Sequence, residues 1–216
     1  MLITGIERTK KGRFSVFCDG EFCCALHIDV FAASPIQVGA RIDPADLEQW
    51  RLQSEARITK DRALRLLSAR AYTGYGLYRK LVTYTDEEIA AEAVARMIEL
   101  GLVDDWDYAR RYAADCMNQK GYSLARTRQA LGQKGIDRAV IDEVLAQRDD
   151  DPEPAIARIL LKKYWRYVEM DEEKGRLRAM NGLLRLGYRH GDIRTVLENL
   201  LEDEDYYRYD DEDEYV

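Results

Sequence analysis

The sequence predicts a mainly α-helical protein, in which three tandem three-helix repeats form an elongated helical body behind a small N-terminal β-meander. Three observations predict this fold. Apolar residues alternate with other residues over about the first 27 positions, which is typical of strands. From Thr59 onward the apolar spacing becomes helical. Helix starts then recur near Thr59, Trp106 and Glu153, about 47 residues apart, which indicates a repeat.

The N-terminal segment predicts three strands followed by one helix. Asp19-Gly20 predicts a two-residue hairpin turn, because glycine tolerates the positive φ that such a turn requires. Asp43 is a good N-cap, and Pro44 suits the first helical position, so we expect a helix from there to about residue 57. The expected strands cover residues 2–7, 14–18 and 22–26.

The second and third repeats share a glycine between their second and third helices, Gly135 in one and Gly187 in the other. A glycine at this position can end a helix in the left-handed conformation. Apolar residues follow each glycine at the same offsets, +1, +6, +9 and +10, and so predict one buried helix face. These residues are Ile136, Ile141, Val144 and Leu145 after the first glycine, and Tyr188, Ile193, Val196 and Leu197 after the second.

The first repeat is a weaker copy of this pattern. Its turn near Leu81 has no glycine. Thr85 and Glu88 predict a capping box at the start of its last helix, and Gly101 predicts the end of that helix. The expected domains are a meander with a linker helix (1–58), repeat 1 (59–105), repeat 2 (106–151), repeat 3 (152–201) and an acidic disordered tail (202–216).

The net charge of −7 comes from the end of the chain. Residues 202–216 hold nine acidic side chains against Arg208, a net of −8, which leaves residues 1–201 near +1. Residues 155–196 carry 10 Lys+Arg against 5 Asp+Glu. This mild basic excess permits an anionic partner. The tail is interpreted either as a solubilising disordered end or as an acidic segment that competes for the basic face.

The residues that could carry chemistry predict no enzyme. Phosphate-cradling glycine motifs are absent, and two histidines with four scattered cysteines cannot supply a metal site with credible spacing. Asp104-Asp105 is the one pair of adjacent carboxylates at a position that could suggest catalysis. Helix capping explains this pair better than acid–base catalysis does. No apolar run is long enough to span a membrane, and no signal peptide is visible. We therefore expect a cytoplasmic protein with reduced thiols and no cofactor.

Basic side chains are interleaved with aromatic ones in all three repeats. This combination suits phosphate contacts and base stacking, or an acidic protein surface. The alternative is a solvated helix face on which basic stems cover buried aromatic rings. The candidate residues are Arg65, Arg70, Arg79, Lys80, Arg110, Arg111, Lys120, Arg126, Arg128, Lys134, Lys162, Lys163 and Arg166.

An ordered series of residues extends through the predicted repeats. It begins with Ala63, Leu64, Leu66, Leu67 and Arg70, followed by Leu77, Lys80 and Leu81; it continues with Leu100-Gly101-Leu102-Val103-Asp104-Asp105, Tyr108-Ala109 and Lys120-Gly121; it ends with Leu131, Lys134-Gly135-Ile136 and Leu184, Leu186-Gly187-Tyr188. This series resembles the RecX family, the regulators of the bacterial recombinase RecA. The resemblance covers residues 59–201, and residues 1–58 resemble an extension that some members carry.

The resemblance implies tandem three-helix repeats that lie in the groove of the RecA–single-stranded DNA filament. It implies a monomeric, non-enzymatic regulator in DNA repair, homologous recombination and the SOS response, which modulates recombinase and ATPase activity, most simply by inhibition. It also implies affinity for single-stranded DNA and weaker affinity for double-stranded DNA. Two other functions stay open, namely a helix-turn-helix-like DNA-binding protein and a helical-repeat adaptor without a DNA role.

The sequence departs from the family pattern in the first and third repeats. Family members usually show a polar residue and Ser-x-x-Glu-Leu after the position of Arg70, where this chain has Tyr72-Thr73-Gly74-Tyr75-Gly76-Leu77. The two glycines lower the helix propensity of this segment by about 1 kcal/mol each. Arg189 stands where Asp137 is expected to cap the corresponding helix of repeat 2.

Overall fold

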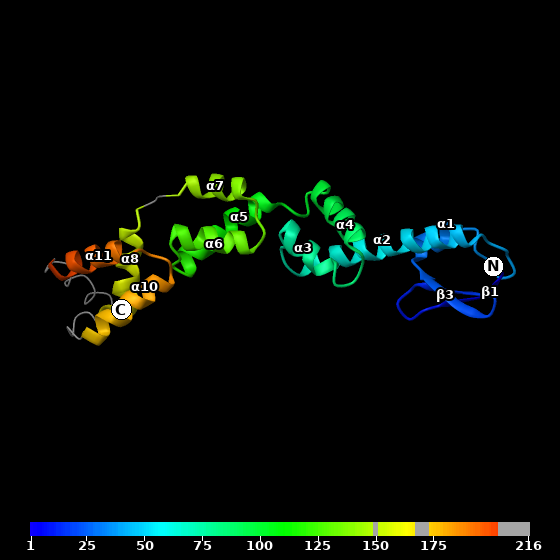
Figure 1. Ribbon diagram of the computed structural model, residues 1–216, viewed down its shortest axis with the longest axis horizontal. Coiled ribbons are helices and arrows are strands. Elements are labelled where there is room, and N and C mark those ends of the chain that lie inside the picture. The colour runs from blue at the N-terminus through cyan, green and yellow to red at the C-terminus, as the bar shows by residue number, and fades with distance from the viewer. Residues whose placement is uncertain (149–150, 167–172, 203–216) are drawn as a thin grey trace, which may run out of the picture. The chain divides into compact units, whose positions relative to one another are not determined.

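A computed structural model describes residues 1–148, 151–166 and 173–202 of the chain (Figure 1). The chain divides into two compact units, Met1–Asp104 and Asp105–Val216. We call them unit 1 and unit 2 and describe each by itself. The mainly α-helical fold class with a small N-terminal antiparallel sheet is confirmed.

The N-terminal meander has the predicted three strands, β1 (Ile3–Arg8), β2 (Phe14–Cys18) and β3 (Glu21–Leu26), in the order β1-β2-β3. Both neighbouring pairs are antiparallel. Asp19 and Gly20 form the turn with φ values of 50° and 91°, so the predicted two-residue hairpin is confirmed. Positive φ at both positions matches the right-handed twist of the flanking strands.

Two helices support this sheet. A short helix α1 (Ile28–Ala33), which the sequence analysis did not predict, precedes the long helix α2 (Pro44–Ala69). Asp43 caps α2 as predicted, because its Oδ1 accepts a hydrogen bond of 2.8 Å from the backbone N–H of Ala45. The predicted end of this helix near residue 57 is wrong. No glycine or proline interrupts the segment, so the helix continues and the boundary expected at 58/59 lies inside it.

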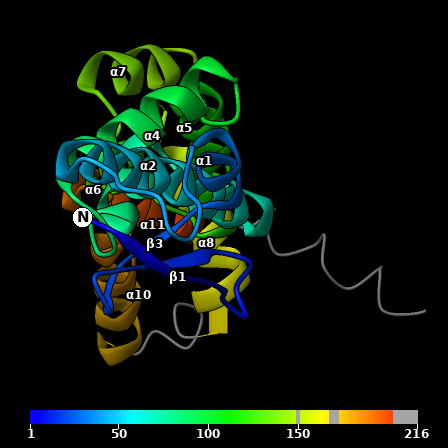
Figure 2. The same cartoon turned by 90° about the vertical axis from the view of Figure 1, so that its right-hand side faces the viewer.

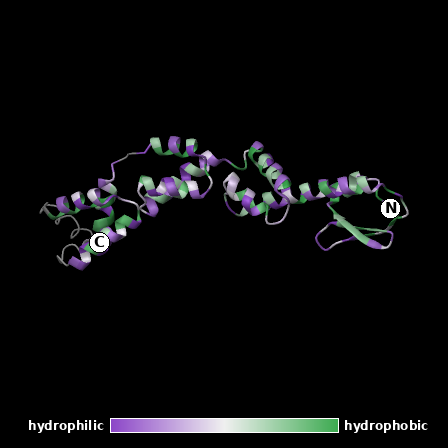
Figure 3. Cartoon of the chain, in the orientation of Figure 1, coloured by the Kyte–Doolittle hydropathy of each residue, from purple (hydrophilic) through white to green (hydrophobic). Residues whose placement is uncertain are grey.

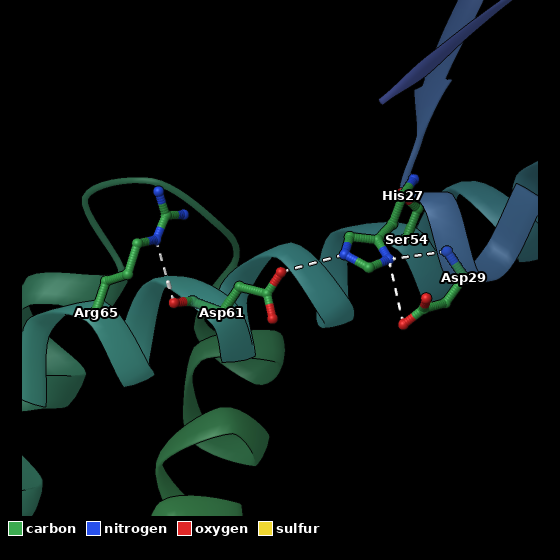
Figure 4. Close-up of polar contacts among 5 residues, drawn as sticks. All are labelled: His27, Asp29, Ser54, Asp61 and Arg65. Atoms are coloured by element: carbon green, nitrogen blue, oxygen red, sulfur yellow. Dashed lines mark hydrogen bonds and ion pairs between the residues drawn. The ribbon is translucent and has the colours of Figure 1, made fainter. Parts of the chain in front are cut away.

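Helix α2 therefore serves both the meander and the first three-helix repeat. It contacts β3, α1, α3 and α4, and Figure 2 shows the sheet beneath α1 and α2. His27 ties the meander to the middle of the helix: its backbone N–H donates to Ser54 Oγ, and its Nε2 lies 3.1 Å from Asp61 Oδ2 (Figure 4). The Nδ1 of His27 also accepts from the backbone N–H of Asp29 at the start of α1.

Unit 1 is completed by α3 (Gly74–Leu81) and α4 (Glu87–Glu99). The predicted capping box of α4 is wrong. Asp86 occupies the N-cap position, and Thr85 instead donates a hydrogen bond of 2.8 Å to Glu55 Oε1 on α2. Gly101 follows α4 with φ of 67°, as predicted. The core of this repeat is Ala63, Leu77, Leu81, Ala90, Ala93, Val94, Met97 and Val103.

Unit 2 contains two three-helix groups. The first group consists of α5 (Asp105–Ala114) with its π-helical continuation η1 (Asp115–Gln119), α6 (Leu124–Gln133) and α7 (Arg138–Ala146). The second consists of α8 (Glu153–Ile159) with the π-helical continuation η2 (Leu160–Tyr164), α10 (Glu173–Arg185) and α11 (His190–Glu202). The sequence pattern gives no sign of the π-helical turns. Figure 3 shows hydrophobic and hydrophilic residues mixed along these helices.

The glycine signature of repeats 2 and 3 is confirmed. Gly135 and Gly187 have φ values of 76° and 91°, the left-handed conformation in which glycine carries no steric cost. All eight apolar residues at the shared offsets are buried. The acidic tail expected from residue 202 lies outside the described residues, apart from Glu202 at the end of α11.

The two groups of unit 2 meet in a closely packed junction at Ser123 and Gly187. Ser123 caps α6, accepting a hydrogen bond from the backbone N–H of Arg126, and its hydroxyl also donates a 2.8 Å bond to the carbonyl of Gly187. The backbone N–H of Ser123 donates to the carbonyl of Leu186. A Cβ on Gly187 would lie 2.6 Å from both Arg126 Cβ and Ser123 Oγ. The third repeat therefore needs glycine here for close contact as well as for its φ angle.

Candidate nucleic-acid interface

The thirteen basic residues predicted from the sequence are all exposed. Each unit brings some of them together, and the two sets are described separately. Unit 1 carries Arg65 and Arg70 at the end of α2 and Arg79 and Lys80 on α3. Unit 2 carries Arg110 and Arg111 on α5, Lys120 after η1, Arg126 and Arg128 on α6, Lys134 at its C-terminal end, Lys162 and Lys163 on η2, and Arg166.

Cations lie over aromatic rings in the first group of unit 2. The Nζ atoms of Lys120 and Lys134 lie 4.6 and 5.3 Å from the ring centroid of Tyr112. Lys120 and Arg126 also lie 5.7 and 5.6 Å from the ring of Tyr122. Cations are attracted to ring faces at such distances by the ring quadrupole. The end of α5, η1 and both ends of α6 thus hold three cations around two rings.

One of these two rings, that of Tyr112, is tied to the core of the group. Tyr112 is half-buried and packs against the core of the group, and it stacks on Tyr108 with centroids 5.8 Å apart. Burial raises the pKa of the Tyr112 phenol above its ordinary value, so the ring stays neutral at physiological pH. Desolvation lowers the pKa of Lys120, but the neighbouring Cys116 and Tyr112 raise it by more. The pKa therefore lies above its ordinary value, and the ammonium group of Lys120 stays charged.

Ion pairs within unit 2 distinguish the predicted basic residues from one another. Asp107 pairs with both Arg110 and Arg111, at 3.0 and 2.7 Å. Arg128 pairs with Asp142 of α7. A phosphate would have to displace these carboxylates, whereas it could approach Lys120 and Arg126 directly. We therefore regard Arg110, Arg111 and Arg128 as weaker candidates than the sequence pattern indicates.

Unit 1 arranges its cations around tyrosines. The guanidinium carbon of Arg70 lies 4.3 Å from the ring centroid of Tyr72, and that of Arg79 lies 5.9 Å from Tyr75. Two further cations lie over the ring of Tyr84. Arg65 lies on α2, and its Nε donates to the carbonyl of Asp61 (Figure 4).

Sequence reasoning missed two members of the unit 1 surface, Arg62 and Tyr84. Arg62 on α2 lies 4.1 Å from the centroid of the Tyr84 ring, and the Nζ of Lys80 lies 5.7 Å from it. The separation of four residues between Lys80 and Tyr84 is a signal that could have identified half of this arrangement. The approach of Arg62 from another helix left no sequence signal.

The junction of unit 2 leaves an open hollow of about 600 Å³ beside Ser123 and Gly187. Arg148, Arg158 and Arg189 line it together with Asp151 and Asp192, and the sequence analysis did not single out these arginines as site residues. In the described part of the chain, no group of three or more His, Cys, Asp or Glu side chains could hold a metal ion. None of the described helices is long and apolar enough to cross a membrane.

Comparison with known proteins places this architecture in a family. The family model described as "RecX, second three-helix domain" matches residues 104–145. The chain is 33% identical over 147 residues to the regulatory protein RecX of Caldanaerobacter subterraneus subsp. tengcongensis, covering 67% of this chain and 74% of the relative. It is 28% identical over 209 residues to that of Clostridioides difficile, covering 95% and 98% of the two chains.

Solved structures show the same fold. A crystal structure of regulatory protein RecX superimposes with a TM-score of 0.65 at 24% identity, covering 91% of this chain and 98% of the other. That of RecX from Lactobacillus salivarius gives a TM-score of 0.58 at 23% identity, covering 68% and 96%. The 33% identity to the relative from Caldanaerobacter subterraneus, 74% of which this chain covers, shows that the chain belongs to the RecX family of regulatory proteins.

Proposed function

We propose that this protein is a non-enzymatic regulator of the RecA recombinase in DNA repair. It binds the groove of the RecA–single-stranded DNA filament as a cytoplasmic monomer and inhibits recombinase and ATPase activity. Membership of a family of regulatory proteins supports the regulatory role. The ordered residue series of the three repeats supports RecA as the partner.

The observation that carries the proposal is the exposure of all thirteen predicted basic residues, seven of which lie over aromatic rings. Exposed cations neutralise phosphate charge, and aromatic rings beside them offer faces on which unpaired bases stack. A filament offers both phosphates and a long repeating surface, which suits tandem repeats. The strongest proposed contacts are Arg65, Arg70, Arg79, Lys80, Lys120, Arg126, Lys134, Lys162, Lys163 and Arg166.

The charge on the last helices of repeats 2 and 3 disfavours the helix-turn-helix alternative. On α7, Arg138 lies 3.8 Å from Asp142, and Glu143 is also exposed. On α11, Arg194 is paired with Glu198 at 2.6 Å. A helix that enters a major groove lies between two lines of phosphates, where such carboxylates are repelled. Binding to a RecA filament through other faces avoids that cost.

The test is co-sedimentation of the full chain with RecA–single-stranded DNA filaments, with RecA-catalysed strand exchange and ATP hydrolysis measured alongside. We expect co-sedimentation and slower strand exchange. The variant Lys162→Glu/Lys163→Glu should weaken both effects, because it reverses two exposed charges on η2. The matched control is Lys10→Glu/Lys11→Glu, which makes the same charge change at two exposed residues of the hairpin between β1 and β2.

Absence of co-sedimentation together with unchanged strand exchange would contradict the proposal. Equal weakening by the variant and its control would mean that net charge, rather than the proposed face, sets the affinity. Sequence-specific protection of double-stranded DNA without RecA would favour the helix-turn-helix alternative instead.

A further inference from the structure

Two tyrosines of unit 1 stand outside its core. Tyr75 on α3 is 47% exposed, and Tyr84 after α3 is 53% exposed. Their neighbours Tyr72 and Tyr78 pack against the core of the same repeat, whereas Tyr75 and Tyr84 are not among the residues that do so. A tyrosine ring in a core contributes to stability through the apolar area that it buries. More than 45% exposure means that these two rings gain much less from burial, so packing does not explain them.

Both rings lie next to cations from two helices. Arg62 of α2 lies 4.1 Å and Lys80 of α3 lies 5.7 Å from the centroid of Tyr84. Arg79 lies 5.9 Å from the centroid of Tyr75. Within the described residues, none of these three cations forms an ion pair with a carboxylate. We call Arg62, Tyr75, Arg79, Lys80 and Tyr84 the tyrosine surface.

The surrounding sequence is also strongly basic. Residues 60–84 contain six Lys+Arg and a single acidic residue, Asp61. Asp61 is held by the meander, because its Oδ2 lies 3.1 Å from His27 Nε2 (Figure 4). An anion that approaches the tyrosine surface therefore meets several cations, although the exposed carboxylates of Asp86, Glu87 and Glu88 follow Tyr84 at the start of α4.

We propose that the tyrosine surface binds single-stranded nucleic acid directly, with bases stacked on Tyr75 and Tyr84 and phosphates contacting Arg62, Arg79 and Lys80. Base–aromatic stacking needs an accessible ring face. Duplex nucleic acid keeps its base faces stacked internally, and an acidic protein surface has no bases to stack. Exposed rings beside unpaired cations therefore fit a single strand best.

This inference deepens the proposed function, and it rests on that proposal for nucleic acid as the ligand class. It goes further in naming the rings that stack on unpaired bases and the cations that contact the phosphates beside them. Tyr75 also lies in the glycine- and tyrosine-rich segment before and within α3, where the sequence departs from the family pattern.

The test measures binding of the full chain to a fluorescently labelled oligothymidylate in the absence of RecA, by anisotropy at low salt. Tyr75→Leu/Tyr84→Leu removes both rings and keeps apolar side chains, and we expect its affinity to fall about tenfold or more. Tyr75→Phe/Tyr84→Phe keeps both rings and should bind within about twofold of the unaltered protein. Because both rings are largely exposed, each variant should fold, which circular dichroism and thermal melting will check.

Phe22→Leu is the matched control, since Phe22 of β3 is 59% exposed, and no described cation lies over its ring. It should leave the affinity unchanged. Iodouracil-substituted oligonucleotides should photocrosslink to Tyr75 or Tyr84, as mapped by mass spectrometry. A leucine variant that binds like the unaltered protein, or a phenylalanine variant that loses as much affinity as the leucine variant, would overturn the stacking proposal.

Two further measurements separate this proposal from RecA regulation. A duplex of matched length should bind more weakly, and the leucine substitutions should not change its affinity; equal losses for both nucleic acids would overturn the proposal. Loss of oligothymidylate binding supports the tyrosine surface whether or not the unaltered protein co-sediments with RecA filaments. Failure of co-sedimentation by the unaltered protein, in contrast, contradicts the proposed function alone.

Discussion

Units 1 and 2 both place cations over tyrosine rings, but the rings differ in what else they contact. In unit 2, Tyr112 packs against the core of its repeat while Lys120 and Lys134 lie over its ring. In unit 1, Tyr75 and Tyr84 carry similar cations and lie outside the core. A cation over a ring is therefore ambiguous by itself. The exposure of the ring distinguishes a covered core residue from a surface that a base can reach.

The close packing of unit 2 also constrains its glycines more tightly than the packing of unit 1 does. Gly187→Ala should destabilise the protein by about 2–5 kcal/mol, because left-handed backbone and an overpacked Cβ add their costs. Gly101→Ala in unit 1 has a similar positive φ but nothing within 4 Å of its Cβ, so about 1–2 kcal/mol is expected. Urea unfolding, with hydrogen exchange to resolve the two units, measures both. Equal losses would mean that the junction at Gly187 can relax around a methyl group.

The serine of that junction should have the next largest effect. Ser123→Ala removes an N-cap, worth about 1 kcal/mol, and the hydrogen bond to the carbonyl of Gly187, worth about 1 kcal/mol more. Asp43→Ala in unit 1 removes an N-cap with no second partner of this kind, and should cost about 1 kcal/mol. Urea midpoints compare the two variants. If Ser123→Ala costs no more than Asp43→Ala, the bond to Gly187 contributes nothing net.

The glycine turns and the helix caps at Asp43 and Asp137 could be predicted from the sequence because local rules determine them. Gly135, Gly187 and the Asp19-Gly20 turn all adopt the expected positive φ. The capping box at Thr85 failed because Glu55, from a helix distant in sequence, offered the hydroxyl a different partner. The end of the linker helix was misplaced because it was expected at the start of the first repeat. The chain has no glycine or proline there, so α2 continues through that point.

The candidate site divides in the same way. The pairs of Asp107 with Arg110 and Arg111 have helical spacings of three and four residues, so they could have been read from the sequence. The pair of Arg128 with Asp142 joins two helices, and its formation depends on how α6 and α7 pack. The contrast between buried and exposed rings was equally invisible, because it depends on which face of each helix meets the core.

The contrast between the rings themselves predicts unequal effects on stability. Tyr112→Leu should cost about 1–2 kcal/mol, since it removes a ring that packs on the core and stacks on Tyr108. Tyr84→Leu should change stability by less than about 0.5 kcal/mol, as is usual for exposed positions. Thermal and urea unfolding measure both variants. A loss at Tyr84 as large as that at Tyr112 would make Tyr84 a structural residue and weaken the case for the tyrosine surface.

The smallest expected effect concerns the thiols of the meander in unit 1. Burial raises the pKa of Cys18 and of Cys24 from 9.0 to about 11. Because these pKa values are raised in the folded state, the unfolded chain loses its protons first, and stability falls as the pH rises from about 9 to about 11. At pH 9 the loss is about 0.4 kcal/mol per thiol relative to pH 7.

The double variant Cys18→Ala/Cys24→Ala should remove that part of the pH dependence, although its stability at pH 7 will also be lower. The quantity to compare is therefore the change in unfolding free energy between pH 7 and pH 9, measured for the variant and for the unaltered protein. Hydrogen exchange should place the difference in unit 1, where both thiols are buried between the sheet and its covering helices. Burial in the meander requires that these thiols ionise more readily when the protein unfolds. Identical pH dependence in the two proteins would contradict this.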